Sequence, residues 1–392
     1  MHDPARDKGH GLADLTLTDK QQRELTDVAR SCLEGPLPAD LPEQVRSRFG
    51  VDLSADYPPL SMPTPLMVAP GQMSLRPEHI RRAVSAGFGG VVLKSHVGES
   101  ASGLCSMTWM RRRPTTIRTF YEEADTAGQR PIIHWNGRGD TRSWAEYEPF
   151  AREAVRIAAD SPVALVGSFL CHLPQLEEGW IEEEWVLAGR RHAELGFCAV
   201  EIDFCPYIEC EGEGARRETV LRWYRGATEL IHRGAPGLAV YPKLLSLPWG
   251  VPFSVEMARA AVDGGAAGLV CSNRIYKPRY ESGHGGCELF ERNLAAMRAI
   301  RGAGMGCPIV GTGGIYTGVE LLAYILAGAS CGQVMSILMG RFATPLPRRG
   351  DRFAAVNWRI LLDPAHGLVA ALLDGANRGR PSSVRGLVGA DL

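Results

Sequence analysis

The sequence predicts an α/β protein built on a (β/α)8 (TIM) barrel, with an N-terminal helical extension and a C-terminal helix. Short apolar runs alternate with helix-like segments through most of the 392 residues, and this alternation is typical of a parallel sheet with crossover helices. A glycine cluster between the last two apolar runs is a second indication, because such barrels often carry functional loops after strands 7 and 8. We expect the extension over residues 1–57, the barrel over 58–345, and a C-terminal helix and tail over 346–392.

The extension is expected to contain one amphipathic helix near Thr18–Leu33. Its apolar positions recur at helical spacing, namely Leu25, Val28, Ala29 and Cys32. The run Asp56–Pro59 then interrupts the pattern before the barrel begins. The extension lacks the apolar face of a membrane anchor, and it is a candidate for a homodimer contact.

Nine apolar runs are candidate strands, one more than an eight-stranded barrel uses: Leu66–Ala69, Gly90–Leu93, Pro131–His134, Val163–Val166, Ala199–Phe204, Leu238–Pro242, Gly268–Cys271, Ile309–Val310 and Gln333–Leu338. We interpret Pro131–His134 as the extra run, because it leads into the glycine-containing loop Asn136–Gly139. Helices are predicted between most runs, at Pro77–Ala86, Trp144–Ala158, Trp180–Leu195, Thr219–His232, Ser254–Asp263 and Leu289–Arg301, and one more near Asp351–Leu362.

The segment Pro308–Met339 carries the most specific local pattern in the chain. A short apolar strand is followed by Gly311, Gly313 and Gly314, then by a helix over Val319–Ala327 and a further apolar run. Parallel strand ends with free backbone N–H groups and little side-chain bulk form phosphate sites. The segment therefore predicts a bound phosphate group.

Composition excludes several classes of function. Lysine and arginine number 43 against 44 acidic residues, so no basic field for nucleic acid exists. No apolar run reaches the roughly 18 residues of a membrane span, and the first residues lack a signal core; we therefore expect a cytoplasmic protein without a membrane partner. The 10 cysteines are scattered without a C-x-x-C pair, which argues against a metal or iron–sulfur site.

Two lysines at predicted strand ends point to a bound anion. Lys94 and Lys243 each follow a buried run, where an unpaired ammonium is costly. A single lysine of this kind is explained equally well by a salt bridge at the barrel mouth and by a bound anion. Two of them, together with a phosphate site, favour an anionic cofactor.

Seven segments, in order, resemble the dihydroorotate dehydrogenase-like family of FMN barrels, which also includes the reductase domain of dihydropyrimidine dehydrogenases. They are PLMVAPG, SAGFGGVVLKS, VEIDFCPY, AVYPKLL, GLVCSNR, GHGGCEL and GTGGIYTGVELLAYILAGASCGQVMSIL. The resemblance covers roughly Pro63–Arg341. It implies a flavoprotein oxidoreductase with FMN as cofactor, a small-molecule substrate, and an electron donor or acceptor of unspecified identity.

The resemblance also implies roles for individual residues. The flavin ring would contact Ala69, Gly71, Lys94, Ser95, Lys243 and Asn273, and its phosphate would be held by Gly286, Gly313, Gly314, Met335 and Ser336. Cys205 would move a proton while hydride passes to or from the flavin, with Lys94 beside it; a thiol with a pKa near about 8.5 suits that task. Cys210 is a rival on the same loop.

The substrate-binding positions depart from the family. Asparagines of the family are replaced by Asp203 and Tyr207, and Arg274 replaces a serine, while the substrate loop contains His134 and Asn136. Several mismatched polar partners at about 1–3 kcal/mol each disfavour dihydroorotate, and the replacements suit an aromatic or carboxylated molecule. The Asp203 carboxylate would also oppose a reduced, anionic flavin unless Lys243 or Lys94 pairs with it.

We therefore hypothesise an FMN-dependent oxidoreductase that oxidises or reduces a C–C bond of a small polar or aromatic substrate other than orotate. Two other classes stay open. One is a non-redox barrel lyase or aldolase with Lys94 or Lys243 as a Schiff-base amine. The other is a non-catalytic barrel that binds a phosphorylated ligand or a protein partner.

Overall fold

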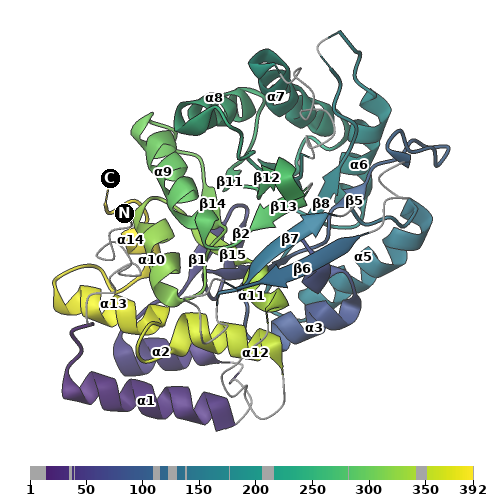
Figure 1. The fold of residues 1–392 in the computed structure, drawn as a ribbon. Helices are drawn as coiled ribbons and strands as arrows, with labels where there is room; N and C mark the ends of the chain where they lie inside the picture. The colour runs from purple at the N-terminus through teal and green to yellow at the C-terminus, as the bar shows by residue number, and fades with distance from the viewer. Residues whose placement is uncertain are drawn as a thin grey trace.

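The computed structural model describes residues 15–34, 38, 40–108, 115–121, 130–136, 139–175, 177–204, 216–280, 282–340 and 351–391. Figure 1 shows a ring of strands surrounded by helices. Among the described residues, no helix is both long and apolar enough to cross a membrane.

Eight parallel strands form the barrel, and their order around the ring follows their order in the chain. They are β3 (Leu66–Val68), β4 (Gly90–Val92), β8 (Ala164–Leu170), β9 (Ala199–Ile202), β10 (Ala239–Pro242), β11 (Leu269–Cys271), β14 (Ile309–Thr312) and β15 (Cys331–Val334). β15 pairs with β3, and β10 joins β11 through a bridge between Lys243 and Val270, where the Leu244 N–H donates to the Val270 carbonyl at 2.9 Å. This arrangement confirms the predicted (β/α)8 barrel.

Helices cover the outside of the ring (Figure 1), as expected for parallel strands joined by crossovers. They are α3 (Pro77–Ser85), α5 (Trp144–Ala159), α6 (Glu182–Glu194), α7 (Arg217–Gly234), α8 (Gly250–Asp263), α9 (Glu288–Gly302) and α10 (Gly318–Leu326). Each buries one face, and in α7 that face includes Val220, Trp223, Ala227 and Ile231. The start of α5 is fixed by Ser143, whose backbone N–H donates to the Glu146 carboxylate at 2.8 Å.

A four-stranded antiparallel sheet lies across the barrel mouth (Figure 1). It contains β6 (Thr116–Phe120), β7 (Ile132–Asn136), β12 (Ile275–Lys277) and β13 (Ser282–Gly285). The run Pro131–His134 is therefore outside the barrel, which confirms that it is the extra strand. Ile117, Trp135 and Gly283 are aligned across three strands of this sheet, so they share one face. We call it the cover sheet.

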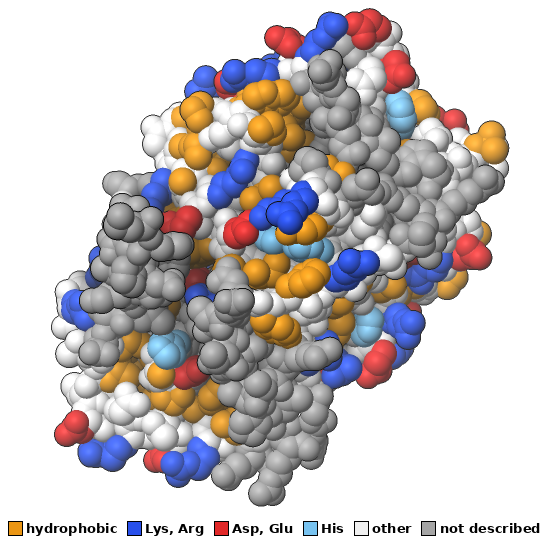
Figure 2. Space-filling model, in the orientation of Figure 1, with side chains coloured by type: hydrophobic (Ala, Val, Ile, Leu, Met, Phe, Trp, Pro, Cys, Tyr) orange, Lys and Arg blue, Asp and Glu red, His pale blue; other side chains and the backbone are white. Residues whose placement is uncertain are grey.

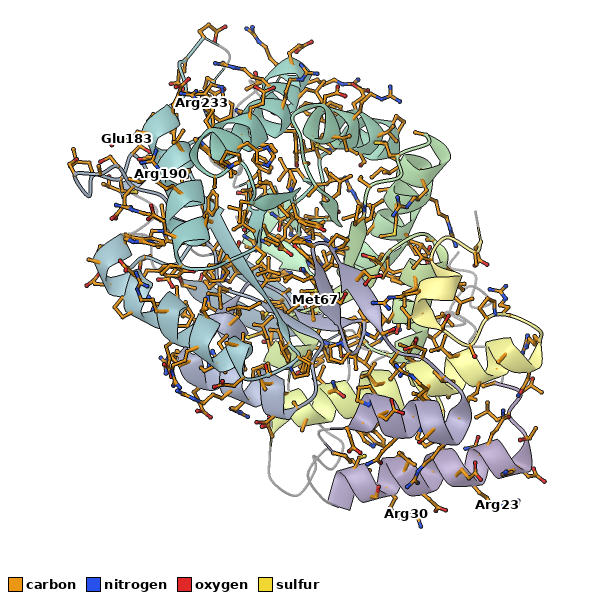
Figure 3. The ribbon with its side chains drawn as sticks, turned by 180° about the vertical axis from the view of Figure 1, so that it is seen from behind. Arg23, Arg30, Met67, Glu183, Arg190 and Arg233 are labelled. Atoms are coloured by element: carbon orange, nitrogen blue, oxygen red, sulfur yellow. The ribbon has the colours of Figure 1, made fainter. Side chains whose placement is uncertain are left out.

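A hairpin fills the opposite end of the barrel, where the sequence indicated only a break. Its strands are β1 (Ala55–Tyr57) and β2 (Leu60–Met62), and Figure 3 shows them from behind, beside Met67. Tyr57 is fully buried, with its ring centroid 4.2 Å from that of Tyr241. The Tyr241 hydroxyl in turn donates to the Pro58 carbonyl at 2.5 Å, so the hairpin is joined to the barrel interior.

The two terminal regions pack together against one side of the barrel. The predicted first helix is present as α1 (Asp19–Glu34) and is followed by α2 (Leu41–Phe49). The predicted helix near residue 351 is α12 (Arg352–Asn357), continued by a π-helical turn over Trp358–Leu362, and two further helices follow, α13 (Leu368–Asn377) and α14 (Val384–Leu387). The Trp358 indole N–H donates to the Ala29 carbonyl of α1 at 2.8 Å.

Two details of the sequence prediction are wrong. The end of the chain was expected to hold a single helix, whereas α13 buries six successive residues, 368–373, against the barrel. The run Gln333–Leu338 was expected to be one strand, but β15 ends at Val334 and a short helix, α11, begins at Ser336 (Ser336–Met339). A short, mostly apolar run does not by itself distinguish a strand from a strand followed by a buried helical turn.

Close packing of α10 against the C-terminal region predicts that Gly318 tolerates no side chain. A Cβ there would lie 1.9 Å from the Leu368 nitrogen and 2.5 Å from the Ile360 carbonyl oxygen. We expect Gly318→Ala to lower the free energy of unfolding by about 1–3 kcal/mol, as overpacking does. Urea denaturation would measure it.

The matched control is Gly302→Ala at the end of α9, where a Cβ would meet nothing within 4 Å. That variant should be unchanged or more stable by up to about 1 kcal/mol, because alanine favours helix. Equal stability of the two variants would contradict the packing of α13 against α10.

Candidate functional site

A cavity lies between the barrel mouth and the cover sheet. From the barrel side it is lined by Ala69, Pro70, Gly71, Gln72, Lys94, Asp203, Lys243, Ser272, Asn273, Arg274, Leu289, Thr312, Gly313, Gly314, Ile315, Tyr316, Gln333, Val334, Met335, Ser336 and Met339. The cover sheet contributes Ile117, Ile133, Trp135 and Gly285. These barrel residues follow or end the strands, which is where barrels of this class carry functional groups.

One end of the cavity is formed by backbone with unused N–H groups. Gly313 and Gly314 have φ angles of 92° and 71°, a region that favours glycine, and a Cβ on either would lie within 2.8 Å of a Cβ atom in α9. Among the described residues, the N–H groups of Gly313, Gly314 and Ser336 donate to no protein acceptor. An anion at this end would supply the missing acceptors.

Beneath the cavity, Lys243 is paired with a carboxylate that the sequence analysis overlooked. The Lys243 Nζ atom lies 3.4 Å from Oε2 of Glu201, and the two side chains are 8% and 0% exposed. Oε1 of Glu201 accepts hydrogen bonds from the Tyr57 hydroxyl at 3.3 Å and from the Gln333 side-chain amide. The signal in the sequence was an acidic residue inside the otherwise apolar strand β9, which ordinarily requires a partner.

Lys94 lies under the cover sheet beside a second cation. Its Nζ atom is 4.9 Å from the ring centroid of Trp135, and the Arg274 guanidinium carbon is 3.8 Å from the same centroid, so both make cation–π contacts. Burial, with the charge of Arg274 as the second cause, lowers the pKa of Lys94 to about 8. The cavity thus has a cationic wall around one indole ring.

Asp203 balances part of this charge. The Asn273 side-chain amide donates to Oδ1 of Asp203 at 2.7 Å, and Oδ1 of Asn273 accepts from the Arg274 N–H at 2.9 Å. Asp203 also attracts the Lys94 ammonium electrostatically. Lys243 forms its ion pair with Glu201 instead. Of the two lysines that the sequence offers as partners for Asp203, it is therefore Lys94 whose charge Asp203 offsets.

Most of the predicted site residues meet in this cavity. Its lining includes Ala69, Gly71, Lys94, Asp203, Lys243, Asn273, Arg274, Gly313, Gly314, Met335 and Ser336. Ser95 is buried nearby with its hydroxyl 2.9 Å from that of Ser168, and Gly285, rather than Gly286, reaches the cavity. Cys205 and Tyr207, together with the rival Cys210, lie outside the described residues.

His134 and Asn136 do not line the cavity, although both were predicted to bind substrate. On β7 they alternate with Trp135, so they face the other side of the cover sheet. The His134 ring lies 4.5 Å from Phe120 and 4.6 Å from Tyr280, centroid to centroid. Basic, acidic, histidine and apolar side chains gather near the centre of the face that Figure 2 shows. Ile133 and Trp135, which alternate with them on β7, are the residues of this strand that reach the cavity.

Comparison with known proteins gives low-identity matches to one class of enzyme. No protein-family model matches the chain. Dihydroorotate dehydrogenase B (NAD(+)), catalytic subunit, of Solidesulfovibrio magneticus is 31% identical over 160 residues, which are 38% of this chain and 51% of that protein. Dihydroorotate dehydrogenase A (fumarate) of Lactiplantibacillus plantarum is 24% identical over 337 residues, or 80% and 99% of the two chains.

A third relative is dihydroorotate dehydrogenase B (NAD(+)), catalytic subunit, of Pyrococcus abyssi, at 25% identity over 69% of this chain and 82% of that protein. The higher-identity match to the Solidesulfovibrio protein spans only about half of that relative's length. The (β/α)8 fold and these matches together establish a distant similarity to dihydroorotate dehydrogenases.

Proposed function

We propose that the protein is an FMN-dependent oxidoreductase that oxidises or reduces a C–C bond of a small polar or aromatic substrate other than orotate. The observation that carries the proposal is a single cavity in which unused backbone N–H groups at one end lie together with Lys243 and Lys94. The similarity to dihydroorotate dehydrogenases supports it. Orotate itself is disfavoured by Asp203 and Arg274, which replace the polar partners expected for it.

The residues present fit FMN. Gly313, Gly314 and Ser336 would hold its phosphate through backbone N–H groups, as strand-end glycine loops do. Among the described residues, Oε1 of Gln333 accepts no hydrogen bond, and it is available to a ring N–H. Bound FMN supplies hydride exchange with a substrate C–H bond, and the Lys243 ammonium would stabilise negative charge at the ring's pyrimidine edge.

The substrate side of the cavity favours a flat anion. Trp135 offers an aromatic face, while Arg274 and Lys94 place two positive charges at that face. A carboxylate gains more from charged donors than from neutral ones, and an aromatic or conjugated ring can stack on the planar guanidinium of Arg274, which lies over the indole. One relative is named for fumarate and two for NAD(+), so both compounds are first choices when electron partners are screened.

If the phosphate is bound beside Ser336, the first residue of α11, a negative charge introduced at this position should weaken the binding of FMN. We expect Ser336→Asp to weaken FMN binding by roughly tenfold or more, because a carboxylate near the phosphate costs at least about 1.4 kcal/mol at an effective dielectric of about 20. Flavin absorbance during FMN titration measures the affinity.

Ser336→Asn is the control, since it matches the aspartate in size and carries no charge. Riboflavin lacks the phosphate, so its affinity should be equal in the two variants. Unchanged FMN affinity in Ser336→Asp would place the phosphate elsewhere, and a wild-type protein that takes up no FMN would refute the proposed function.

The proposed proton transfer by Cys205 predicts a selective kinetic defect. Cys205→Ala should slow flavin reduction or oxidation by the substrate by about 100-fold or more, as loss of a general acid–base group does. Stopped-flow absorbance of the flavin measures that rate. Reduction by dithionite needs no enzymatic proton donor and should be unaltered, and Cys210→Ala should behave like wild type; the reverse pattern would assign the role to Cys210.

One observation favours a second candidate function, a lyase or aldolase that forms a Schiff base at Lys94. Its pKa of about 8 leaves a larger share of free amine than an ordinary lysine has, and amines activated in this way attack carbonyl groups. Borohydride in the presence of a carbonyl substrate would then link substrate to wild-type protein and not to Lys94→Met. Absence of labelling, together with a bound flavin spectrum, favours the oxidoreductase.

A further inference from the structure

We propose that Glu201 is a positioning residue: it keeps the Lys243 ammonium charged and fixed at the cavity wall, and thereby raises the midpoint potential of flavin bound there. This inference rests on the proposed FMN function. Lys243 lines the cavity, whereas Glu201 does not appear among the described lining residues. Glu201 therefore acts from beneath, through the lysine.

Three donors from three separate elements converge on this carboxylate. Oε2 faces the Lys243 ammonium, which follows β10, at 3.4 Å. Oε1 accepts from Tyr57 of β1 at 3.3 Å and from Gln333 of β15. An ionised carboxylate is purely an acceptor, so three donors around it favour the charged form. Burial raises the pKa of Glu201, and the lysine, the glutamine and the tyrosine oppose that rise.

The lysine needs this counter-ion to remain protonated. A buried ammonium without an opposite charge loses its proton at lower pH, and two further cations, Lys94 and Arg274, line the same cavity. Their repulsion adds to the cost of a charged Lys243, and Asp203 is already hydrogen-bonded to Asn273. Glu201 is therefore the acid that balances Lys243.

The charged groups on the cavity side of the pair are Lys94, Arg274 and Asp203, whereas three groups packed beneath it are uncharged near neutral pH. Burial raises the pKa values of Tyr57, Tyr241 and Cys331 above their ordinary ranges. These three groups therefore add no charge beside Glu201, whereas Lys94, whose pKa is about 8, also titrates in the range studied below and does so in all four chains. Tyr57 belongs to the hairpin at the closed end of the barrel, so this hairpin helps to fix the charge under the cavity.

The experiment compares four FMN-loaded chains: wild type, Glu201→Gln, Lys243→Met and the double variant. Midpoint potentials are measured spectrophotometrically from pH 6 to 9. We expect Glu201→Gln to lower the potential at the alkaline end, where Lys243 has lost its proton, and to approach wild type at the acidic end. Lys243→Met should lower it at every pH, and Glu201→Gln added to Lys243→Met should cause no further fall.

The inference would be overturned if Glu201→Gln had the same midpoint potential as wild type. It would also be overturned if Glu201→Gln lowered the potential equally in the wild-type and the Lys243→Met chains. In either case the proposed function would still stand. Failure of wild type to bind FMN would overturn both. If Glu201→Gln does not fold, Glu201→Asp replaces it, because the charge is kept and only its reach is shortened. That variant should show a smaller fall that also depends on Lys243, and an unchanged potential in it would count against the inference.

Discussion

Parallel closure of eight strands is the constraint on which the site depends. Each strand ends at the same mouth of the barrel, so residues as far apart in the chain as Ala69 and Ser336 line one cavity. The ring is completed between β10 and β11 by the bridge between Lys243 and Val270 and by backbone hydrogen bonds that the N–H groups of Leu244, Ala267 and Asn273 donate across the join. The lysine that faces the proposed flavin is therefore also part of the join between β10 and β11. A change in the backbone there would disturb the closure of the barrel and the position of the charge together.

A second constraint is the cost of charge inside a packed barrel. The interior contains Lys243 and Glu201, and neither is more than 8% exposed. Burying either one alone would cost several kcal/mol by desolvation. The structure answers this cost with hydrogen bonds from Tyr57 and Gln333, and thus the hairpin that closes one end of the barrel is chemically connected to the cavity at the other end.

The part of the site that could be predicted from sequence is the part made by local pattern. Lys94, Lys243 and the glycines Gly313 and Gly314 follow apolar runs directly, and parallel topology brings such positions together. The contact between Tyr57 and Glu201 joins residues 144 positions apart, and no local pattern indicates it. For a similar reason, the sequence does not indicate which of His134 and Trp135 faces the cavity. Their two faces are distinguished only once β7 is known to lie across the mouth.

Under the proposed function, the same topology would separate cofactor binding from substrate recognition. The residues proposed to hold FMN are on barrel strands and the loops that follow them, whereas Trp135 belongs to the cover sheet, and Arg274 packs over Gly283 of that sheet. The cover sheet meets the cavity with one face and carries no barrel hydrogen bonds among the described strands. Substitutions on that face can therefore change which molecule is bound without weakening the ring.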